Sequence, residues 1–339
     1  MLRRIAQFAR FKLFARIAIS ALLLFILFSQ LDYSAVRQSA ERAAENWKIL
    51  LVAIIVPPLI GFLISAARWQ SLLNAHGFDI GIRRVLRTLL VSAFFNKFLP
   101  SSVGGDAYRV WAIGKAANSM SAAAASVVID RIFGVLALVL LALVGCALRP
   151  GWYFEVPALQ LCIPLLILAF IFGIAFVLLV RPPGEGFPMV GTRIGQMCTR
   201  FAGALAYYRT KPITLVSAAG YSILLQTNVV IQFWAIGLSL GLESTMDRFL
   251  VAVPLATLAS LLPLSINGLG IREWVMILVC TPLGISQADA AVVSLLFVVS
   301  SLLLSVPGAV ILARSSVDDR LAIVASSTLN ICETTTVSS

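Results

Sequence analysis

The sequence contains 339 residues, of which 60% are hydrophobic and only 12% are charged, and its formal net charge is +11. Soluble domains are about half apolar and about a quarter charged, so this composition predicts a membrane protein and argues against a soluble domain. The basic residues fall in short gaps between apolar runs, which is typical of cytoplasmic membrane loops. No basic soluble domain is left that would bind nucleic acid.

Metal and redox chemistry have little support in the sequence. The five cysteines form no CxxC pair, which is the spacing that indicates zinc or redox sites. The single histidine, His76, lies among polar neighbours and is expected at the surface rather than at a metal. We therefore expect neither a metal site nor a cofactor.

Six apolar runs are long enough to cross a bilayer as helices. They are expected at about 14–31, 47–67, 122–146, 158–180, 212–240 and 288–313. The basic segment 1–16 resembles a signal peptide, but the many apolar runs that follow indicate an uncleaved first helix. The predicted fold is an all-α integral membrane domain over 1–320, followed by a disordered, Ser- and Thr-rich cytoplasmic tail over 321–339.

Two further apolar segments are shorter and broken. Residues 85–99 run into PSSVGG at 100–105, and residues 249–262 run into PLSING at 263–268. Proline and glycine break helices, and broken backbone at membrane depth persists only inside protein or along a wet cavity. Both segments are therefore predicted to be re-entrant helical hairpins. Residues 193–211 are expected to form an amphipathic cytoplasmic linker that touches anionic lipid.

The two breaks resemble one another at a constant offset of 163 residues. Leu99, Pro100, Ser102, Gly105, Arg109 and Trp111 align with Leu262, Pro263, Ser265, Gly268, Arg272 and Trp274. The same offset carries the predicted span 47–67 onto 210–230, and 122–146 onto 285–309. We therefore predict two related repeats, A over about 1–150 and B over about 151–320.

The charge bias predicts the orientation. Basic residues precede the first span and follow the second and fourth, whereas the gaps 32–46, 147–157 and 241–248 are poor in Lys and Arg. Basic loops face the cytoplasm, so both termini are expected there, in a bacterial inner (plasma) membrane. Repeat A then starts inside and repeat B outside, which gives an inverted repeat with its site at the midplane.

Ionisable residues at membrane depth are candidates for function, because each costs at least a few kcal/mol there. The cations are Lys97, Arg109, Arg131 and Arg272, and the anions are Asp106, Asp130 and Glu273. One interpretation is mutual pairing that only holds the hairpins, for which the i,i+3 spacing of Asp106 and Arg109 is suited. The other is a phosphate-binding site, which the excess of cations favours; the three anions would then be charge partners or proton-coupling groups.

The backbone at the two breaks adds to the second interpretation. If the second arm of each hairpin begins at Gly105 and Gly268, both helix N-termini present free N–H groups and positive dipole ends to the centre. The predicted substrate-binding residues are Lys97, Ser102, Gly105, Arg109, Arg131, Ser265, Asn267, Gly268 and Arg272.

Asp130 and Arg131 are neighbours that point about 100° apart on a helix. We expect one of them to contact a hairpin and the other to meet something else. Because Asp is short and Arg can extend into a wet cavity, Asp130 is predicted to contact Lys97 or Arg109, and Arg131 to face the cavity.

Three motifs resemble the lysylphosphatidylglycerol synthase transmembrane family, also called flippase-like or UPF0104 membrane proteins. They are LPSSVGGDAYRVW at 99–111, VVIDRIFG at 127–134 and LPLSINGLGIREW at 262–274. The resemblance implies a membrane domain that translocates lipid. Some relatives also carry a soluble aminoacyltransferase domain, for which the chain after the last span is too short, so synthase activity is not expected.

The leading expectation is a flippase that moves an anionic or phosphate-bearing lipid by alternating access. Its partners would be membrane lipids, with homo-oligomers or lipid-biosynthesis enzymes as further candidates. An integral-membrane enzyme of polyprenyl-phosphate or glycolipid metabolism is the first alternative, although the extracytoplasmic loops, of about 15 residues or fewer, leave little room for a donor site. The second is a non-transporting scaffold of a lipid-synthesis complex, which would not need paired hairpins.

Overall fold

The fold is that of a computed structural model, which describes residues 2–98, 104–180, 193–242, 246–262 and 265–314. Within these residues the chain forms fourteen α-helices, one short 3-10 helix and no strand. The protein is therefore an all-α integral membrane protein, as the composition predicts. The tail expected over 321–339 lies outside the described residues.

Five predicted spans coincide with helices that are long and apolar enough to cross a bilayer. These are α3 (Trp47–Ala75), α6 (Met120–Leu148), α8 (Pro157–Leu179), α10 (Pro212–Ser239) and the run from α13 (Gln287–Leu303) into α14 (Val306–Ala313). The sixth predicted span, 14–31, overlaps α1 (Leu2–Gln30), and α1 counts as a further span only together with the helix after it. The short helices α7 (Trp152–Glu155) and η1 (Tyr208–Thr210) lie in connections.

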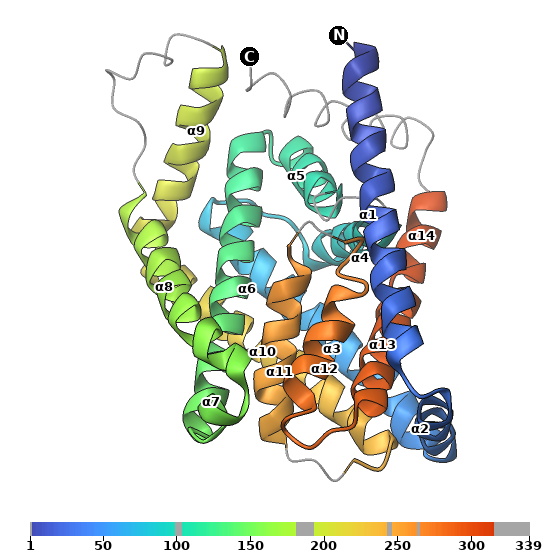
Figure 1. The fold of residues 1–339 in the computed structure, drawn as a ribbon. Helices are drawn as coiled ribbons and strands as arrows, with labels where there is room; N and C mark the ends of the chain where they lie inside the picture. The colour runs from blue at the N-terminus through green and yellow to red at the C-terminus, as the bar shows by residue number, and fades with distance from the viewer. Residues whose placement is uncertain (1, 99–103, 181–192, 243–245, 263–264, 315–339) are drawn as a thin grey trace.

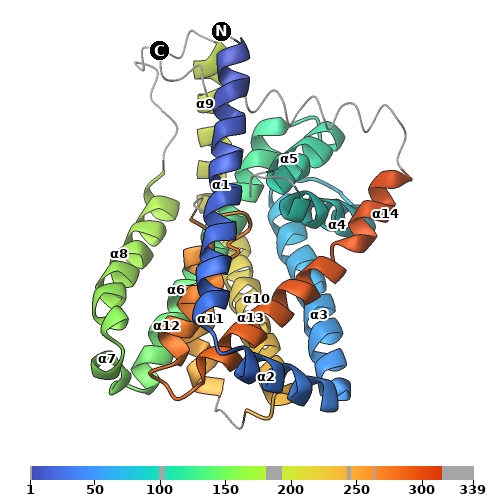
Figure 2. The ribbon, with the colours of Figure 1, turned by 45° about the vertical axis from the view of Figure 1, so that its right-hand side comes forward.

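The gap predicted at 32–46 is a helix, α2 (Tyr33–Glu45), that bends 96° away from α1. Its sequence is rich in Ala, Arg, Gln and Glu, which favour helix. The carboxylate of Asp32 caps it by accepting from the Ser34 backbone N–H at 2.8 Å. Figure 2 shows α2 lying across the end of the bundle beside α13, at nearly a right angle to α1.

The predicted linker at 193–211 contains the amphipathic helix α9 (Arg193–Tyr207). The end of α9 packs on the turn after α3, where His76 stacks on Tyr207 with ring centroids 5.1 Å apart and meets Tyr208 edge-on at 4.8 Å. The expectation of a surface histidine at 76 is wrong, because these rings half-bury it.

Each broken segment forms two short helices on either side of its break. The first pair is α4 (Ile82–Phe98) and α5 (Gly104–Ala116), and the second is α11 (Met246–Ser260) and α12 (Ile271–Cys280). The two helices of each pair pack against one another. Figure 1 shows α4 and α5 at the end of the molecule where the N-terminus lies, whereas α11 and α12 approach from the opposite end.

The two halves of the chain interlock at the centre. Helix α3 packs along α10, α6 packs against α11, and α14 packs against α4. Two glycines allow the last two contacts. A Cβ at Gly145 would lie 2.7 Å from Val251 Cγ2, and one at Gly308 would collide with the backbone carbonyl of Leu90. These glycines are again 163 residues apart, although the division into two repeats stays a prediction.

Candidate functional site

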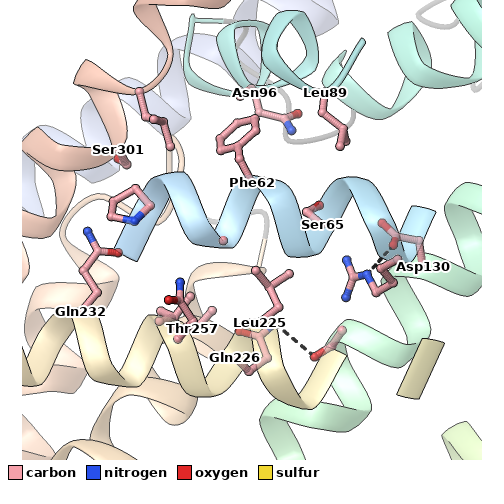
Figure 3. Close-up of a pocket in the computed structure, with 18 of the residues that line it drawn as sticks. Phe62, Ser65, Leu89, Asn96, Asp130, Leu225, Gln226, Gln232, Thr257 and Ser301 are labelled. Carbon is pink, nitrogen blue, oxygen red and sulfur yellow. Dashed lines mark hydrogen bonds and ion pairs between the residues drawn. The ribbon is translucent and has the colours of Figure 1, made fainter. Parts of the chain in front are cut away.

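A cavity of about 390 Å³ lies between the central helices of the two halves. Its walls come from α3, α4, α5, α6, α10, α11 and α13, and Figure 3 shows α3 running through the lining with side chains on both sides. Alongside aliphatic residues, its lining includes the polar residues Ser65, Arg68, Ser92, Asn96, Arg109, Asp130, Arg131, Gln226, Asn228, Gln232, Thr257, Ser300 and Ser301. A concave site with a few convergent polar groups is the usual form of a ligand site.

One end of this cavity is an ionic cluster around Asp130. The Asp130 carboxylate lies 2.7 Å from Arg68 Nε and 2.9 Å from Arg109 Nη2, and the three side chains are 3%, 7% and 5% exposed. A buried carboxylate is stable only when its charge is compensated. Two guanidiniums on two different helices provide that compensation and join α3, α5 and α6.

Arg131 belongs to the same cluster through Asp106. Its Nε and Nη2 each lie 2.8 Å from a carboxylate oxygen of Asp106, which is the bidentate geometry that arginine favours. Asp106 also lies 3.5 Å from Arg109 Nη1. The Arg131 side chain is still 48% exposed and lines the cavity.

The expected contact between Asp130 and Arg109 is present. The expectation that only one of Asp130 and Arg131 meets the first hairpin is wrong, because both contact α5. Asp106 and Arg109 are three residues apart on α5 and so lie on the same face of that helix. From there Arg109 reaches Asp130, and Asp106 reaches Arg131.

Arg68 and Trp69 were not among the predicted site residues. The ring of Trp69 lies 4.1 Å from the Arg109 guanidinium, its Nε1 donates to Ser126 Oγ at 3.1 Å, and Arg68 Nη1 donates to Ser222 Oγ at 2.9 Å. The predicted span 47–67 ends one residue before Arg68, which therefore counted among the basic residues that follow the span. The helix in fact continues to Ala75, and the signal that could have been used is a Trp next to the Arg in a helix-favouring stretch.

The tips of the two hairpins meet. Asn267 Nδ2 donates to the backbone carbonyl of Lys97 at 2.7 Å, and Arg272 Nη2 donates to the Asn267 carbonyl at 3.1 Å. Asn267 has a φ of 53°, the left-handed conformation that asparagine tolerates better than most residues. The Arg272 guanidinium lies 5.2 Å from the ring of Phe297, which lines the cavity.

The prediction that the N–H groups at the two breaks are free to bind a ligand is partly wrong. Helix α5 begins at Gly104, and the Gly105 N–H donates to Asn96 Oδ1 at 3.0 Å. Helix α12 begins at Ile271 rather than at Gly268, and the N–H of Gly270 before it donates to Glu273 Oε2 at 2.7 Å. The Asn96 side chain thus satisfies the Gly105 N–H that was expected to face a ligand, and Glu273 satisfies the N–H just before the start of α12.

The structure therefore divides the predicted residues. Arg109, Asp130 and Arg131 line the cavity, and Asp106 touches two of them. Among the described residues, the other predicted ones lie at the hairpins outside the lining: Lys97, Gly105, Ser265, Asn267, Gly268, Arg272 and Glu273. The buried Ser265 hydroxyl has no hydrogen-bond partner within the described residues. Ser102 lies outside the described residues.

Comparison with known proteins places the chain in a family. The model of the lysylphosphatidylglycerol synthase TM region matches residues 13–308. A UPF0104 membrane protein of Methanothermobacter thermautotrophicus is 24% identical over 280 residues, which are 75% of this chain and 81% of the relative. Another UPF0104 membrane protein, of Methanocaldococcus jannaschii, is 22% identical over 275 residues, or 74% of this chain and 80% of the relative. The match spans nearly all the described helices, the ionic cluster and both hairpin tips, so the chain belongs to the family of the lysylphosphatidylglycerol synthase transmembrane region.

Proposed function

We propose that this protein translocates a phosphate-bearing lipid by alternating access, with the headgroup held in the central cavity. The observation that carries the proposal is that cavity, which is lined by helices of both halves and by three arginines. A site between two interlocked halves can be exposed to either membrane face when one half rocks against the other. A family named for a membrane region of lipid synthesis supports a lipid as the substrate.

The ionic cluster favours an anion. It contains the guanidiniums of Arg68, Arg109 and Arg131 and the carboxylates of Asp106 and Asp130, which leaves one positive charge in excess. Arg131 has the most exposed side chain of the cluster, at 48%, and it lines the cavity. A phosphodiester carries one negative charge, and arginine recognises phosphate in the same two-pronged geometry that it now presents to Asp106.

An enzymatic role for Asp130 has less support. A general base needs a carboxylate that can take up a proton near neutral pH. Asp130 lies between two guanidiniums at 2.7 and 2.9 Å, which favour its ionised form. We therefore propose a transporter rather than a membrane transferase.

The proposed orientation follows from the charge at the two ends. The end with the N-terminus also carries α4, whose first turns contain Arg83, Arg84 and Arg87. Basic residues are enriched on the cytoplasmic side. We propose that this end faces the cytoplasm of the cell that makes the protein and that the membrane is the inner one.

Transport of lipid in proteoliposomes tests the proposal. The purified full chain is reconstituted with acyl-labelled phosphatidylglycerol, and the label is quenched from outside. We expect wild-type protein to expose inner-leaflet label to the quencher. Arg131→Gln should slow the transport of the label by about ten- to a hundredfold, because one hydrogen-bonded charge is lost. The variant should still fold, because Asp106 still has Arg109 as a partner at 3.5 Å.

Arg37→Gln is the matched control. Arg37 forms an exposed ion pair with Glu41 on α2, far from the cavity lining, with side chains 69% and 58% exposed. This variant should transport within about twofold of wild type, because exposed pairs contribute little. Equal rates for wild-type protein, Arg131→Gln and protein-free vesicles would exclude the proposed function.

A further inference from the structure

The carboxylate that lines the cavity is already paired with arginines of the protein. Among the described residues that line it, Asp130 is the sole acid, and its two oxygens face Arg68 and Arg109 at 2.7 and 2.9 Å. An ammonium group in the cavity would find no free counter-ion there and would meet three guanidiniums. An unpaired buried charge is strongly unfavourable, so the lining disfavours a cationic headgroup.

Helix α10 contributes three amide side chains to the lining, and each donates one N–H of its NH₂ group to another part of the protein. Gln226 Nε2 donates to the Gly134 carbonyl at 3.4 Å, and Asn228 Nδ2 donates to the Pro57 carbonyl at 2.8 Å. Gln232 Nε2 donates to Ser300 Oγ at 2.8 Å.

The orientation of these amides is set by their neighbours. A backbone carbonyl can only accept, so the group that faces Gly134 or Pro57 must be the NH₂. Pro58 cannot donate to the carbonyl of Ile54 one turn earlier, and Ser300 Oγ donates to that carbonyl instead, at 2.7 Å. Ser300 has then used its proton and must accept from Gln232. All three amide oxygens are left as acceptors, and no donor from the described residues is bonded to them.

Two hydroxyls of the lining have also used their protons. Thr257 donates to the Val253 carbonyl at 2.7 Å, and Ser301 donates to the Val298 carbonyl at 2.8 Å. Their oxygens, like the amide oxygens, can only accept further bonds. Figure 3 shows Gln232 and Ser301 toward one end of the drawn cavity and Asp130 toward the other. The cavity thus has a cationic end and a wall of neutral acceptors.

The two parts of the cavity meet at Gly134. A Cβ placed there would lie 3.7 Å from Arg68 Nη1 and 3.9 Å from Gln226 Nε2. Gly134 also lies within one helical turn of Arg131 on α6. A phosphate at the cationic end would therefore carry its next substituent toward the side chain of Gln226.

We propose that the substrate is a phosphodiester lipid whose headgroup is uncharged and rich in hydroxyls, such as glycerol or a ring polyol. Hydroxyl groups donate the hydrogen bonds that this wall can accept, and they need no counter-ion. The inference rests on the proposed function and adds the class of headgroup. It predicts that an aminoacylated, cationic headgroup is a poor substrate, although the family takes its name from a lysine-bearing lipid.

The test compares four acyl-labelled lipids in wild-type proteoliposomes of one composition. Phosphatidylglycerol and phosphatidylinositol carry hydroxyls on glycerol and on a ring, respectively. Phosphatidylmethanol is a phosphodiester with the same single charge and no hydroxyl, and lysylphosphatidylglycerol carries extra ammonium groups. We expect one or both hydroxyl-bearing lipids to move about two- to tenfold faster than phosphatidylmethanol, which corresponds to about one neutral hydrogen bond. Lysylphosphatidylglycerol should move at least about tenfold slower than phosphatidylglycerol.

Variants of Gln226 assign the preference to the wall. Gln226→Met removes the acceptor at similar size and should bring the ratio of the rates for the hydroxyl-bearing lipids to the rate for phosphatidylmethanol close to one, whatever it does to the absolute rates. Gln226→Glu supplies a free carboxylate and should raise the rate for lysylphosphatidylglycerol relative to phosphatidylglycerol. Gln70→Met is the matched control, since Gln70 donates to the Ile80 carbonyl at 3.1 Å and lies outside the lining.

The outcomes separate this inference from the function on which it rests. If wild-type protein moves none of the four lipids faster than empty vesicles, the proposed function fails. If it moves lysylphosphatidylglycerol as fast as phosphatidylglycerol, or if Gln226→Met changes all lipids equally, transport stands and the headgroup class is overturned.

Discussion

The two hairpins carry the same arginine in different surroundings. Arg109 and Arg272 follow their breaks at the offset of 163 residues. Arg109 lies 2.9 Å from Asp130 and 3.5 Å from Asp106. Within the residues that the structure describes, Arg272 has no carboxylate at ion-pair distance and instead donates to a backbone carbonyl and lies over Phe297.

The cause lies on the helix that follows each hairpin. At the same offset, Asp130 and Arg131 of α6 are replaced by Val293 and Ser294 of α13. Ser294 donates to Glu273 Oε1 at 3.0 Å, so the second hairpin is held by neutral donors on a carboxylate. The same helical motif is therefore held by an ionic cluster at the first hairpin and by hydrogen bonds at the second. The cluster also belongs to the candidate site, because four of its five members line the cavity.

The largest expected effect is the loss of Asp130. In Asp130→Asn, the buried guanidiniums of Arg68 and Arg109 lose their shared counter-ion, and breaking a buried pair costs about 3–5 kcal/mol. We expect a large drop in the melting temperature of the purified protein in detergent and weak expression. Replacing Arg68 together with Asp130 by neutral residues should recover part of the loss.

The matched change in the second hairpin is Glu273→Gln. Glutamine can still accept from one of the two donors, Gly270 N–H or Ser294 Oγ–H. The cost should be nearer one hydrogen bond to a charged group, about 1.5–3 kcal/mol. If Asp130→Asn and Glu273→Gln lower the melting temperature equally, the ionic cluster at the first hairpin is no more stabilising than the hydrogen bonds at the second.

A smaller effect is expected where the two halves are joined at the end of the bundle. Arg42 of α2 lies 2.6 Å from Asp289 of α13, which also accepts from Ser39 at 2.7 Å and from Ser286. Asp289 is 8% exposed and Arg42 38%. Arg42→Gln should therefore cost about 1–2 kcal/mol, measured by thermal melting.

Arg149→Gln tests whether burial sets that value. Arg149 forms a similar pair with Asp247 at 2.9 Å, but its side chain is 58% exposed. Such a pair should contribute less than about 1 kcal/mol. Equal decreases in melting temperature for Arg149→Gln and Arg42→Gln would show that the exposure of the pair does not determine its contribution to stability.

Most of the fold could be predicted because hydropathy reports it directly. Runs of about 20 apolar residues fixed five of the spans, and proline with glycine located both breaks. Helix α2 was missed because its mean hydropathy is low, and a polar helix beside a span looks like a loop. The start of α12 at Ile271 could not be read from the sequence, since it depends on the Glu273 carboxylate reaching Gly270.

The site was only half predictable. Charges stand out in apolar sequence, so Arg109, Asp130 and Arg131 were found, but their pairing depends on how α5 meets α6. Arg68 was missed because it follows the end of an apolar run. The amides of α10 were missed because nothing in the local sequence separates a cavity-lining glutamine from one that only bonds to a neighbour. Their orientation depends on distant partners, namely the carbonyls of Gly134 and Pro57 and the hydroxyl of Ser300.

The amphipathic helices differ in the same way as the hairpins. Helix α2 is held to the bundle by Arg42 and Asp289, whereas α9 is held at its end by an uncharged aromatic cluster around His76. Tyr208, which follows α9, donates to the Leu72 carbonyl at 3.0 Å. Within the described residues, His76 Nε2 is buried with no hydrogen-bond partner. This arrangement suits a neutral imidazole and leaves no acceptor for a second proton.

The smallest predicted effect is therefore a pH dependence of how firmly α9 is held to the rest of the protein. Burial lowers the pKa of His76, and a hydrogen bond to the Ala204 backbone only partly opposes it. Because the ordinary value is about 6.5, the unfolded chain takes up the proton first as the pH falls. The contribution of His76 to stability is complete above about pH 6.5 and is lost as the pH falls toward the folded-state pKa.

Limited proteolysis of the full protein in detergent at pH 7.5 and 5.5 should show faster cleavage near α9 at the lower pH. His76→Phe keeps a stacking ring beside Tyr207 without the titratable nitrogen, so its cleavage rate should not change between the two values. A pH effect of the same size in His76→Phe would place the titrating group elsewhere.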